Sequence, residues 1–133
     1  MKSSIWLWID IILIALLAWM FIGPWLSTLN AKRYAKLLGN DEFKKGLHTA
    51  QVIDVREERS FKKKHIMGAR NMPYSQFKLF ISALRKDRPV YIYEDGKTLA
   101  VKVAKKLKKA GFTDLAILKN GFSDWDGKVK TGH

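Results

Sequence analysis

The feature that most constrains this chain is an uninterrupted apolar run near its N-terminus. From Ile5 to Leu26 almost every residue is apolar, and Asp10 carries the only charge. At about 1.5 Å rise per residue, a helix of this length spans roughly 33 Å, close to the ~30 Å hydrocarbon core of a bilayer. Lipid offers a bare backbone no hydrogen-bonding partner, so a helix is the conformation expected for this run.

The apolar run fits two interpretations, an uncleaved membrane anchor or a cleaved signal peptide. The apolar stretch of a signal peptide is shorter, about 7–15 residues, and a small-residue cleavage site follows it. Gly23-Pro24-Trp25 is a poor site of that kind, and Pro24 near the end of the run fits a helix terminus. We therefore expect a transmembrane anchor over residues 1–29, a juxtamembrane connector over 30–40 and a folded domain over 41–130.

Charges on the two sides of the run predict its orientation. Lys2 alone precedes the run, whereas several basic residues follow it: Lys32, Arg33, Lys36, Lys44 and Lys45. Basic residues close to a membrane span stay on the cytoplasmic side. The sequence thus predicts a single-pass protein of the cell membrane whose soluble domain faces the cytoplasm.

Beyond the run, short apolar segments alternate with amphipathic ones. Strands that alternate with helices are typical of an α/β fold, in which helices cover both faces of a mainly parallel sheet. Extended segments are expected at 51–55, 69–72, 89–93 and 115–118, and helices at 41–45, 57–64, 75–86, 99–110 and 122–125.

Residues at fixed spacing run through the middle of the chain. A strand ends in Asp54-Val55-Arg56, Phe61 follows, and then comes His65-Ile66-Met67-Gly68-Ala69-Arg70-Asn71-Met72-Pro73. Near the C-terminus stands Leu118-Lys119-Asn120-Gly121-Phe122 with Trp125. These stretches resemble the rhodanese family, in which Asp-Val-Arg precedes Phe and His-Ile-x-Gly-Ala-x-Asn-x-Pro. The resemblance covers about residues 40–127 and implies a rhodanese-like five-stranded, mainly parallel sheet with helices on both faces.

The chain departs from that family at its catalytic loop. It contains no cysteine, whereas the family's loop resembles Cys-x-x-Gly-x-Arg-Ser and begins with the catalytic cysteine. Counting back without gaps from Ala110-Gly111-Phe112 puts the cysteine position at Glu94, the glycine at Lys97 and the substrate-binding arginine at Leu99. The degenerate loop therefore reads Glu94, Asp95, Gly96, Lys97, Thr98 and Leu99.

These replacements bear directly on the chemistry that the resemblance implies. In the family, a thiolate at a helix N-terminus attacks a sulfane sulfur and carries it as a persulfide. A carboxylate is a weak sulfur nucleophile, and Leu99 removes the cation that would hold an anionic donor such as thiosulfate. We therefore assign no catalytic residue and expect a binding or regulatory module. A sulfurtransferase or persulfide carrier acting with a partner's cysteine, or a purely architectural membrane-surface protein, are the alternatives.

The remaining candidate residues each have two interpretations. Glu94 or Asp95 either occupies the loop's N–H cradle, which favours an anion, or both extend into solvent. Asp54 and Arg56 either line the pocket or hold the loops together by hydrogen bonds and ion pairing, which we favour. His65 is expected to be a structural loop residue. The histidine spacing suggests no metal site, and no cofactor is expected.

The chain is strongly basic, with 25 Lys+Arg against 12 Asp+Glu and a formal net charge of +13. One cluster is Lys62-Lys63-Lys64, and another lies on the helix face opposite the apolar stripe: Lys102, Lys105, Lys106 and Lys109. A solvated helix face explains much of this charge, but anionic lipids attract such residues in a tethered domain. The expected partners are the membrane lipid bilayer and a protein of unknown identity. No nucleic acid is expected, because no aromatic-interleaved binding motif accompanies the charge.

Overall fold

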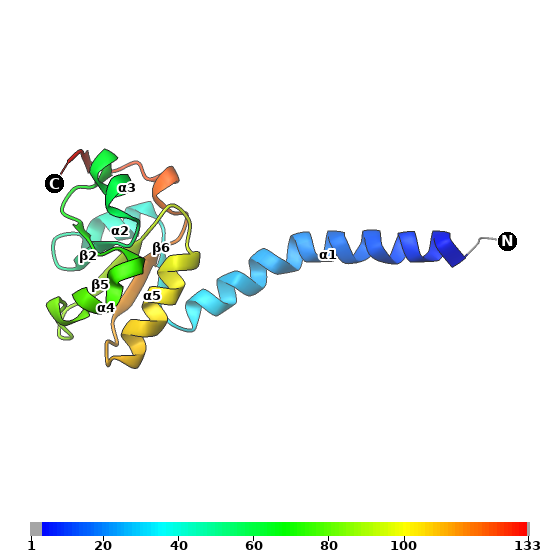
Figure 1. The fold of residues 1–133 in the computed structure, drawn as a ribbon, viewed down its shortest axis with the longest axis horizontal. Helices are drawn as coiled ribbons and strands as arrows, with labels where there is room; N and C mark the ends of the chain where they lie inside the picture. Colours follow the sequence, from blue (N-terminus) through cyan, green and yellow to red (C-terminus); the bar gives the residue numbers. More distant parts are fainter. Residues whose placement is uncertain (1–3, 133) are drawn as a thin grey trace. The chain divides into compact units, whose positions relative to one another are not determined.

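The computed structural model describes residues 4–132, which form two compact units that divide between Arg33 and Tyr34. The first unit is one helix, α1 (Ser4–Lys32), drawn in blue to cyan in Figure 1. Within the described residues, this is the one helix long and apolar enough to cross a membrane. A signal sequence would pass the same test of length and composition.

Pro24 lies inside α1 and does not end it, and Ser27 and Thr28 are helical as well. The expectation that Pro24 marks a helix terminus is therefore wrong. Proline removes one N–H from the helical ladder, and membrane-spanning helices tolerate this where neighbouring groups satisfy the backbone. The missing N–H of Pro24 leaves the carbonyl of Met20, four residues earlier, without its helical donor. The Thr28 hydroxyl donates a separate hydrogen bond to the Pro24 carbonyl at 3.0 Å.

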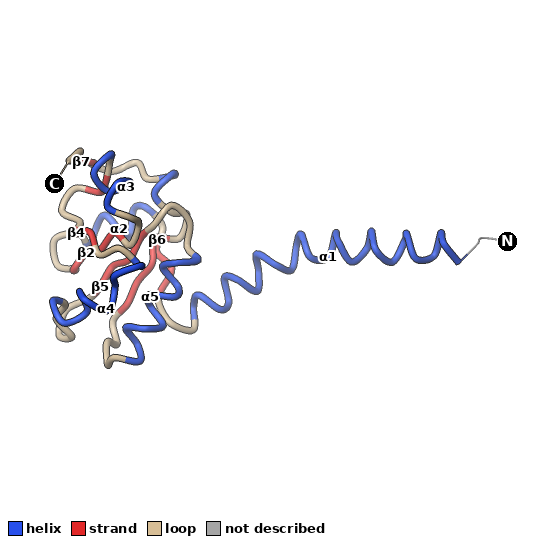
Figure 2. Tube along the Cα trace, viewed as in Figure 1, coloured by secondary structure: helices blue, strands red, loops and turns tan. Residues whose placement is uncertain are grey.

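The second unit is built on a five-stranded sheet. Its spatial order is β1 (Lys36–Leu38), β6 (Leu115–Leu118), β5 (Val90–Tyr93), β2 (Gln51–Asp54) and β4 (Arg70–Asn71). Every neighbouring pair is parallel, so the predicted α/β fold with a five-stranded parallel sheet is confirmed. A separate antiparallel ladder joins β3 (His65–Ile66) to β7 (Val129–Lys130). Figure 2 shows the strands in red.

Helices cover both faces of the sheet. In Figure 1, α4 (Phe77–Phe80) and α5 (Thr98–Lys109) lie on one face, and α2 (Asn40–Gly46) lies on the other. The remaining α-helix is α3 (Glu58–Lys63). Short 3-10 turns complete the described elements: η1 (Tyr74–Gln76), η2 (Ile81–Ala83) and η3 (Phe122–Asp124).

The continuous helix expected over residues 75–86 is wrong, because the segment is divided into η1, α4 and η2. The sequence Phe80-Ile81-Ser82 combines residues of modest helix propensity. Phe77 is buried, whereas Phe80 and Ile81 are only half-buried. The segment therefore lacks the packing that would hold a longer helix against the sheet.

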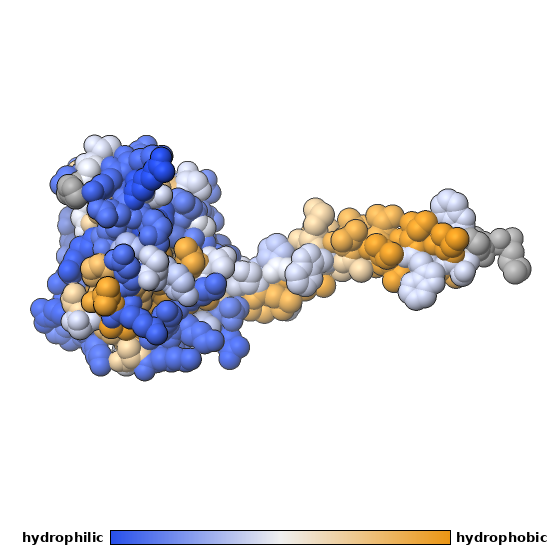
Figure 3. All heavy atoms as spheres, in the orientation of Figure 1, coloured by the Kyte–Doolittle hydropathy of each residue, from blue (hydrophilic) through white to orange (hydrophobic). Residues whose placement is uncertain are grey.

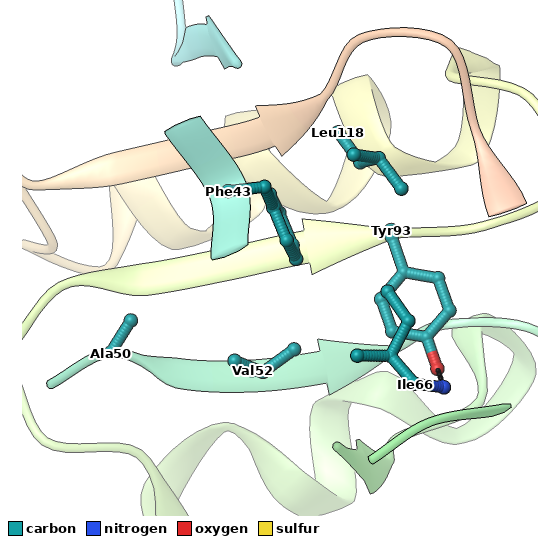
Figure 4. Close-up of a cluster of buried hydrophobic side chains, with 6 residues drawn as sticks. All are labelled: Phe43, Ala50, Val52, Ile66, Tyr93 and Leu118. Atoms are coloured by element: carbon teal, nitrogen blue, oxygen red, sulfur yellow. Dashed lines mark hydrogen bonds between the residues drawn. The ribbon is translucent and has the colours of Figure 1, made fainter. Parts of the chain in front are cut away.

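The core lies on both sides of the central strands. One cluster packs between α2 and the sheet and is drawn in Figure 4: Phe43, Ala50, Val52, Ile66, Tyr93 and Leu118. On the opposite face α5 buries an apolar stripe: Ala100, Val101, Val103, Ala104 and Leu107. Because both faces of the sheet are buried, the sequences of β5 and β6 are continuous apolar runs without apolar–polar alternation. This burial also holds the carboxyl ends of the central strands in place, where the candidate site lies.

Candidate functional site

The candidate residues predicted from the sequence gather at the carboxyl ends of the parallel strands. Asp54 is the last residue of β2, Glu94 directly follows β5, and the turn at Asn120-Gly121 follows β6. In open parallel sheets, ligands bind outside this edge. The sheet order therefore brings together segments that are far apart in the sequence.

Glu94 is buried at the start of the loop that joins β5 to α5, with 8% of its surface exposed. Its Oε2 accepts a hydrogen bond from the backbone N–H of Ala100 at 2.7 Å. Its carbonyl oxygen accepts another from the N–H of Phe122 at 2.8 Å. The side chain thus folds back onto the first turn of α5, where unpaired N–H groups and the helix dipole favour a negative charge. Of the two carboxylates considered, Glu94 is the one in the cradle.

Asp95 points away from the cradle, and its side chain is 71% exposed. Its Oδ1 lies 3.3 Å from Nη1 of Arg56, so it reaches the neighbouring loop as well as solvent. The rest of the loop is partly open: Gly96 and Thr98 are exposed, and Lys97 and Leu99 are half-buried. Leu99 lies in the first turn of α5 and brings no positive charge to it.

Asp54 and Arg56 form a buried ion pair that joins three segments. The Arg56 Nε lies 3.1 Å from both carboxylate oxygens of Asp54, and its Nη2 lies 2.7 Å from Oδ2. The same Nη2 donates to the Lys64 carbonyl at 2.6 Å, and the guanidinium stacks 4.4 Å from the Phe122 ring centre. Burial opposes the charge, but the hydrogen bonds and charge of Asp54 outweigh it and raise the pKa of Arg56. With these contacts Asp54 and Arg56 hold the loops together by hydrogen bonds and ion pairing.

Tyr93 and His65 pack behind this pair. The Tyr93 hydroxyl accepts a hydrogen bond from the N–H of Ile66 at 3.0 Å, the dashed line in Figure 4. Burial, assisted by the charge of Asp54, raises the pKa of Tyr93 above its ordinary value. His65 is 2% exposed, with Nδ1 2.8 Å from the Phe61 carbonyl and its ring stacked 3.7 Å from the Phe61 ring. It is thus a packed structural residue, located in β3 and not in a loop.

Two further residues shape the site, and neither was predicted as a site residue from the sequence. The Asn71 side chain donates hydrogen bonds to the carbonyls of Asp54 at 3.1 Å and Arg56 at 2.9 Å. Gly121 has φ +77°, and a Cβ there would collide with the Asp95 carbonyl. Asn71 lies in the stretch from His65 to Pro73 and Gly121 in the stretch from Leu118 to Phe122. Their place in these fixed-spacing motifs is the sequence feature that could have indicated them. Among residues 4–132, no group of three or more acidic or histidine side chains could hold a metal ion.

A five-stranded parallel sheet covered by helices on both faces, with the candidate loop following its central strand, defines an α/β domain with a rhodanese-like fold. This chain belongs to the rhodanese-like domain family, which it matches over residues 39–128. It is 43% identical over 99 residues to the uncharacterized protein YqhL of Bacillus subtilis, covering 74% of this chain and 79% of that protein. It is 32% identical over 77 residues to the thiosulfate sulfurtransferase GlpE of Shewanella oneidensis, covering 58% and 76%.

Solved structures share the fold. The rhodanese-like domain of the Anabaena sp. Alr3790 protein matches with a TM-score of 0.65 and 27% identity, over 71% of this chain and 78% of that one. A thiosulfate sulfurtransferase from Pseudomonas aeruginosa matches with a TM-score of 0.66 and 31% identity. That match covers 73% of this chain but only 20% of the Pseudomonas chain.

Proposed function

We propose that this chain is a membrane-tethered rhodanese-like domain that does not transfer sulfur and acts as a binding or regulatory module. One observation carries the proposal: the carboxylate of Glu94, which counting along the loop assigns to the position of the family's cysteine, accepts a 2.7 Å hydrogen bond from the Ala100 N–H. The sequence contains no cysteine at any position, so no other thiol in the chain can take over the reaction.

The charges around the loop also oppose an anionic sulfur donor. Thiosulfate entering the loop would meet the negative Glu94 where the family presents a nucleophile. It would find Leu99 where the family presents an arginine. The nearby cation of Arg56 is already paired with Asp54 and Asp95, so it offers little unshared charge to a donor. Because like charges repel strongly in a partly buried site, donor binding is unfavourable before any bond is broken.

The tether and its orientation are part of the same proposal. Helix α1 has the length and apolar composition of a membrane span, and the basic residues that follow it favour a cytoplasmic domain. Protease added to inside-out vesicles should digest the domain, and protease added to intact spheroplasts should leave it whole. Protection of the domain inside inside-out vesicles would contradict this orientation.

A sulfurtransferase or persulfide carrier that uses a partner's cysteine is the second candidate. It is favoured by the similarity to GlpE, which is named a thiosulfate sulfurtransferase. On that account the chain would position a donor, and the partner's thiolate would perform the attack.

The thiosulfate–cyanide assay separates these functions. The full chain in lipid nanodiscs is compared with Glu94→Cys/Leu99→Arg, which restores both lost groups, and with the matched control Glu94→Ser/Leu99→Arg. We expect thiocyanate only from the cysteine variant, because only that chain offers a thiolate at the cradle. Turnover by the natural chain would overturn the proposal. Turnover that appears only after a cysteine-containing membrane partner is added would favour the carrier.

A further inference from the structure

We propose that the domain docks on the anionic lipid headgroups of its own membrane through one defined surface, here named the lysine face. The lysine face consists of Lys102, Lys105, Lys106 and Lys109 on α5 together with Leu79 on α4. The inference rests on the membrane tether of the proposed function and specifies which surface meets the bilayer.

The four lysines project from one side of α5. Their spacing of three, four and seven residues along the helix places them in one row, opposite the apolar stripe that packs on the sheet. Lys102, Lys105 and Lys109 are exposed, and Lys106 is half-buried. Among residues 4–132, none of these four amines lies in an ion pair with a carboxylate, so their charges are uncompensated.

The lysine face adjoins the point where the domain begins. Tyr34 is the first residue of the domain unit, and the Lys105 amine lies 6.0 Å from the centre of its ring. The apolar run ends at Leu26 and α1 ends at Lys32, which adds about 9 Å of helix at ~1.5 Å per residue. Only this short length of chain separates the apolar run from the domain, so the tether is short enough to keep the domain close to the headgroups.

An exposed apolar residue stands beside these charges. A groove of about 340 Å³ between α4 and α5 is lined by Leu79, Phe77, Tyr74 and Lys106 among others. The amines of Lys102 and Lys106 lie 6.0 Å and 4.8 Å from the Tyr74 ring centre, and Leu79 is 76% exposed. Figure 3 shows hydrophobic residues within a mostly hydrophilic surface over this part of the domain. An exposed apolar side chain beside a row of lysines is the composition of a membrane-interface surface.

The positive charge of the lysine face alone would suit any polyanion. The membrane tether favours anionic lipid over nucleic acid and acidic proteins. A bilayer that holds α1 is present at high effective concentration, whereas nucleic acid or an acidic protein must arrive from solution. Each basic residue near an anionic surface raises the ratio of docked to undocked domain about fivefold. Insertion of Leu79 at the acyl boundary adds a contribution that nucleic acid would not supply.

The test uses the full chain in nanodiscs of phosphatidylcholine, alone or mixed with phosphatidylglycerol. Because the chain has no cysteine, Leu79→Cys can carry a single polarity-sensitive fluorophore, with Thr131→Cys as the control position. We expect a blue shift of the Leu79 label with the anionic lipid only, reversed by high salt, and no shift at Thr131. Co-elution of protein and nanodisc tests the tether itself.

Charge variants then locate the contact. Changing the four lysines of the lysine face to glutamine should abolish the shift, and Lys105→Gln alone should lower the docked-to-undocked ratio about fivefold. A control that removes the same charge elsewhere should keep the shift: Lys62, Lys63, Lys119 and Lys128 changed to glutamine. Circular dichroism verifies that each variant is folded.

Three results would overturn the docking alone. The first is a protein that co-elutes with the nanodisc but whose label at position 79 shows no blue shift with anionic lipid. This result would support the tether and refute the docking. The second is an equal loss of the shift in the control variant. The third is a shift caused by duplex DNA in neutral nanodiscs but never by anionic lipid, which would assign the face to nucleic acid. Failure to co-elute would instead refute the tether and, with it, the docking.

Discussion

Replacing Arg56 with leucine should destabilise the domain by about 3–5 kcal/mol, because removing one partner of a buried ion pair leaves the other charge uncompensated. Asp54 is fully buried. It would keep the hydrogen bond from the Arg56 backbone N–H at 2.9 Å but lose every contact from the guanidinium. The Lys64 carbonyl would lose its 2.6 Å donor as well. Since domains are stable by only about 5–15 kcal/mol, much of the folding free energy would be lost.

A double variant separates the cost of leaving the Asp54 charge unpaired from the cost of losing the packing of the Arg56 side chain. Asp54→Leu/Arg56→Leu removes both charges, and apolar replacement of a buried pair is often close to neutral. It should therefore be more stable than Arg56→Leu alone. The matched control is Arg85→Leu, which breaks the exposed pair with Asp87 and should leave stability unchanged.

Hydrogen exchange of peptides from β2 and β5, measured by mass spectrometry in nanodiscs, gives the opening free energy of the domain separately from that of α1. A loss below about 1 kcal/mol for Arg56→Leu, the range of exposed ion pairs, would refute the reasoning. A double variant whose loss equals the sum of the two single losses would refute it too, because it would show no coupling between the partners.

Other substitutions test the remaining contacts. Tyr93→Phe should cost about 1–3 kcal/mol, because the buried Ile66 N–H loses its acceptor. The raised pKa of Tyr93 adds stability that is fully present below about pH 10 and is lost as the pH rises further, since only the unfolded tyrosine ionises there. Thermal melts from pH 8 to 11 should therefore converge for the two chains. Glu94→Leu should cost about 1.5–3 kcal/mol and Glu94→Gln clearly less, because the amide oxygen can still accept; equal losses by chemical denaturation would contradict this. Gly121→Ala should cost about 1–3 kcal/mol in the same measurement, because its φ of +77° strains any side chain, whereas Gly39→Ala, with φ −71° and open space, should cost much less.

The central strands were predictable because their signal is local. The segments at 89–93 and 115–118 are short apolar runs bounded by turn residues, and they form β5 and β6. Strand β1 was not predicted, since Lys36-Leu37-Leu38 has no β-branched residue and is too short to show the apolar–polar alternation of a strand. Its extended form depends on pairing with Ala116, Ile117 and Leu118, which lie far away in the sequence.

The site was predictable in position but not in detail. Counting along the loop located Glu94 at the start of the cradle, because loop length is a property of the sequence. The direction of its side chain was not readable, since Glu94 and Asp95 are neighbouring carboxylates and either could reach an N–H group. The structure resolves the choice through contacts with other segments: the Phe122 N–H donates to the Glu94 carbonyl, and the Asp95 carboxylate pairs with Arg56. These are contacts between segments that only the fold brings together.

The central claim is that the chain's own carboxylate fills the cradle that would otherwise hold an anionic sulfur donor. Titration calorimetry of thiosulfate into the full chain tests it most directly, with Glu94→Ala/Leu99→Arg as the comparison. We predict no binding heat from the natural chain and measurable binding by the variant, whose cradle is empty and whose first helical turn is cationic. Thiosulfate binding by the natural chain at the variant's affinity would contradict the account.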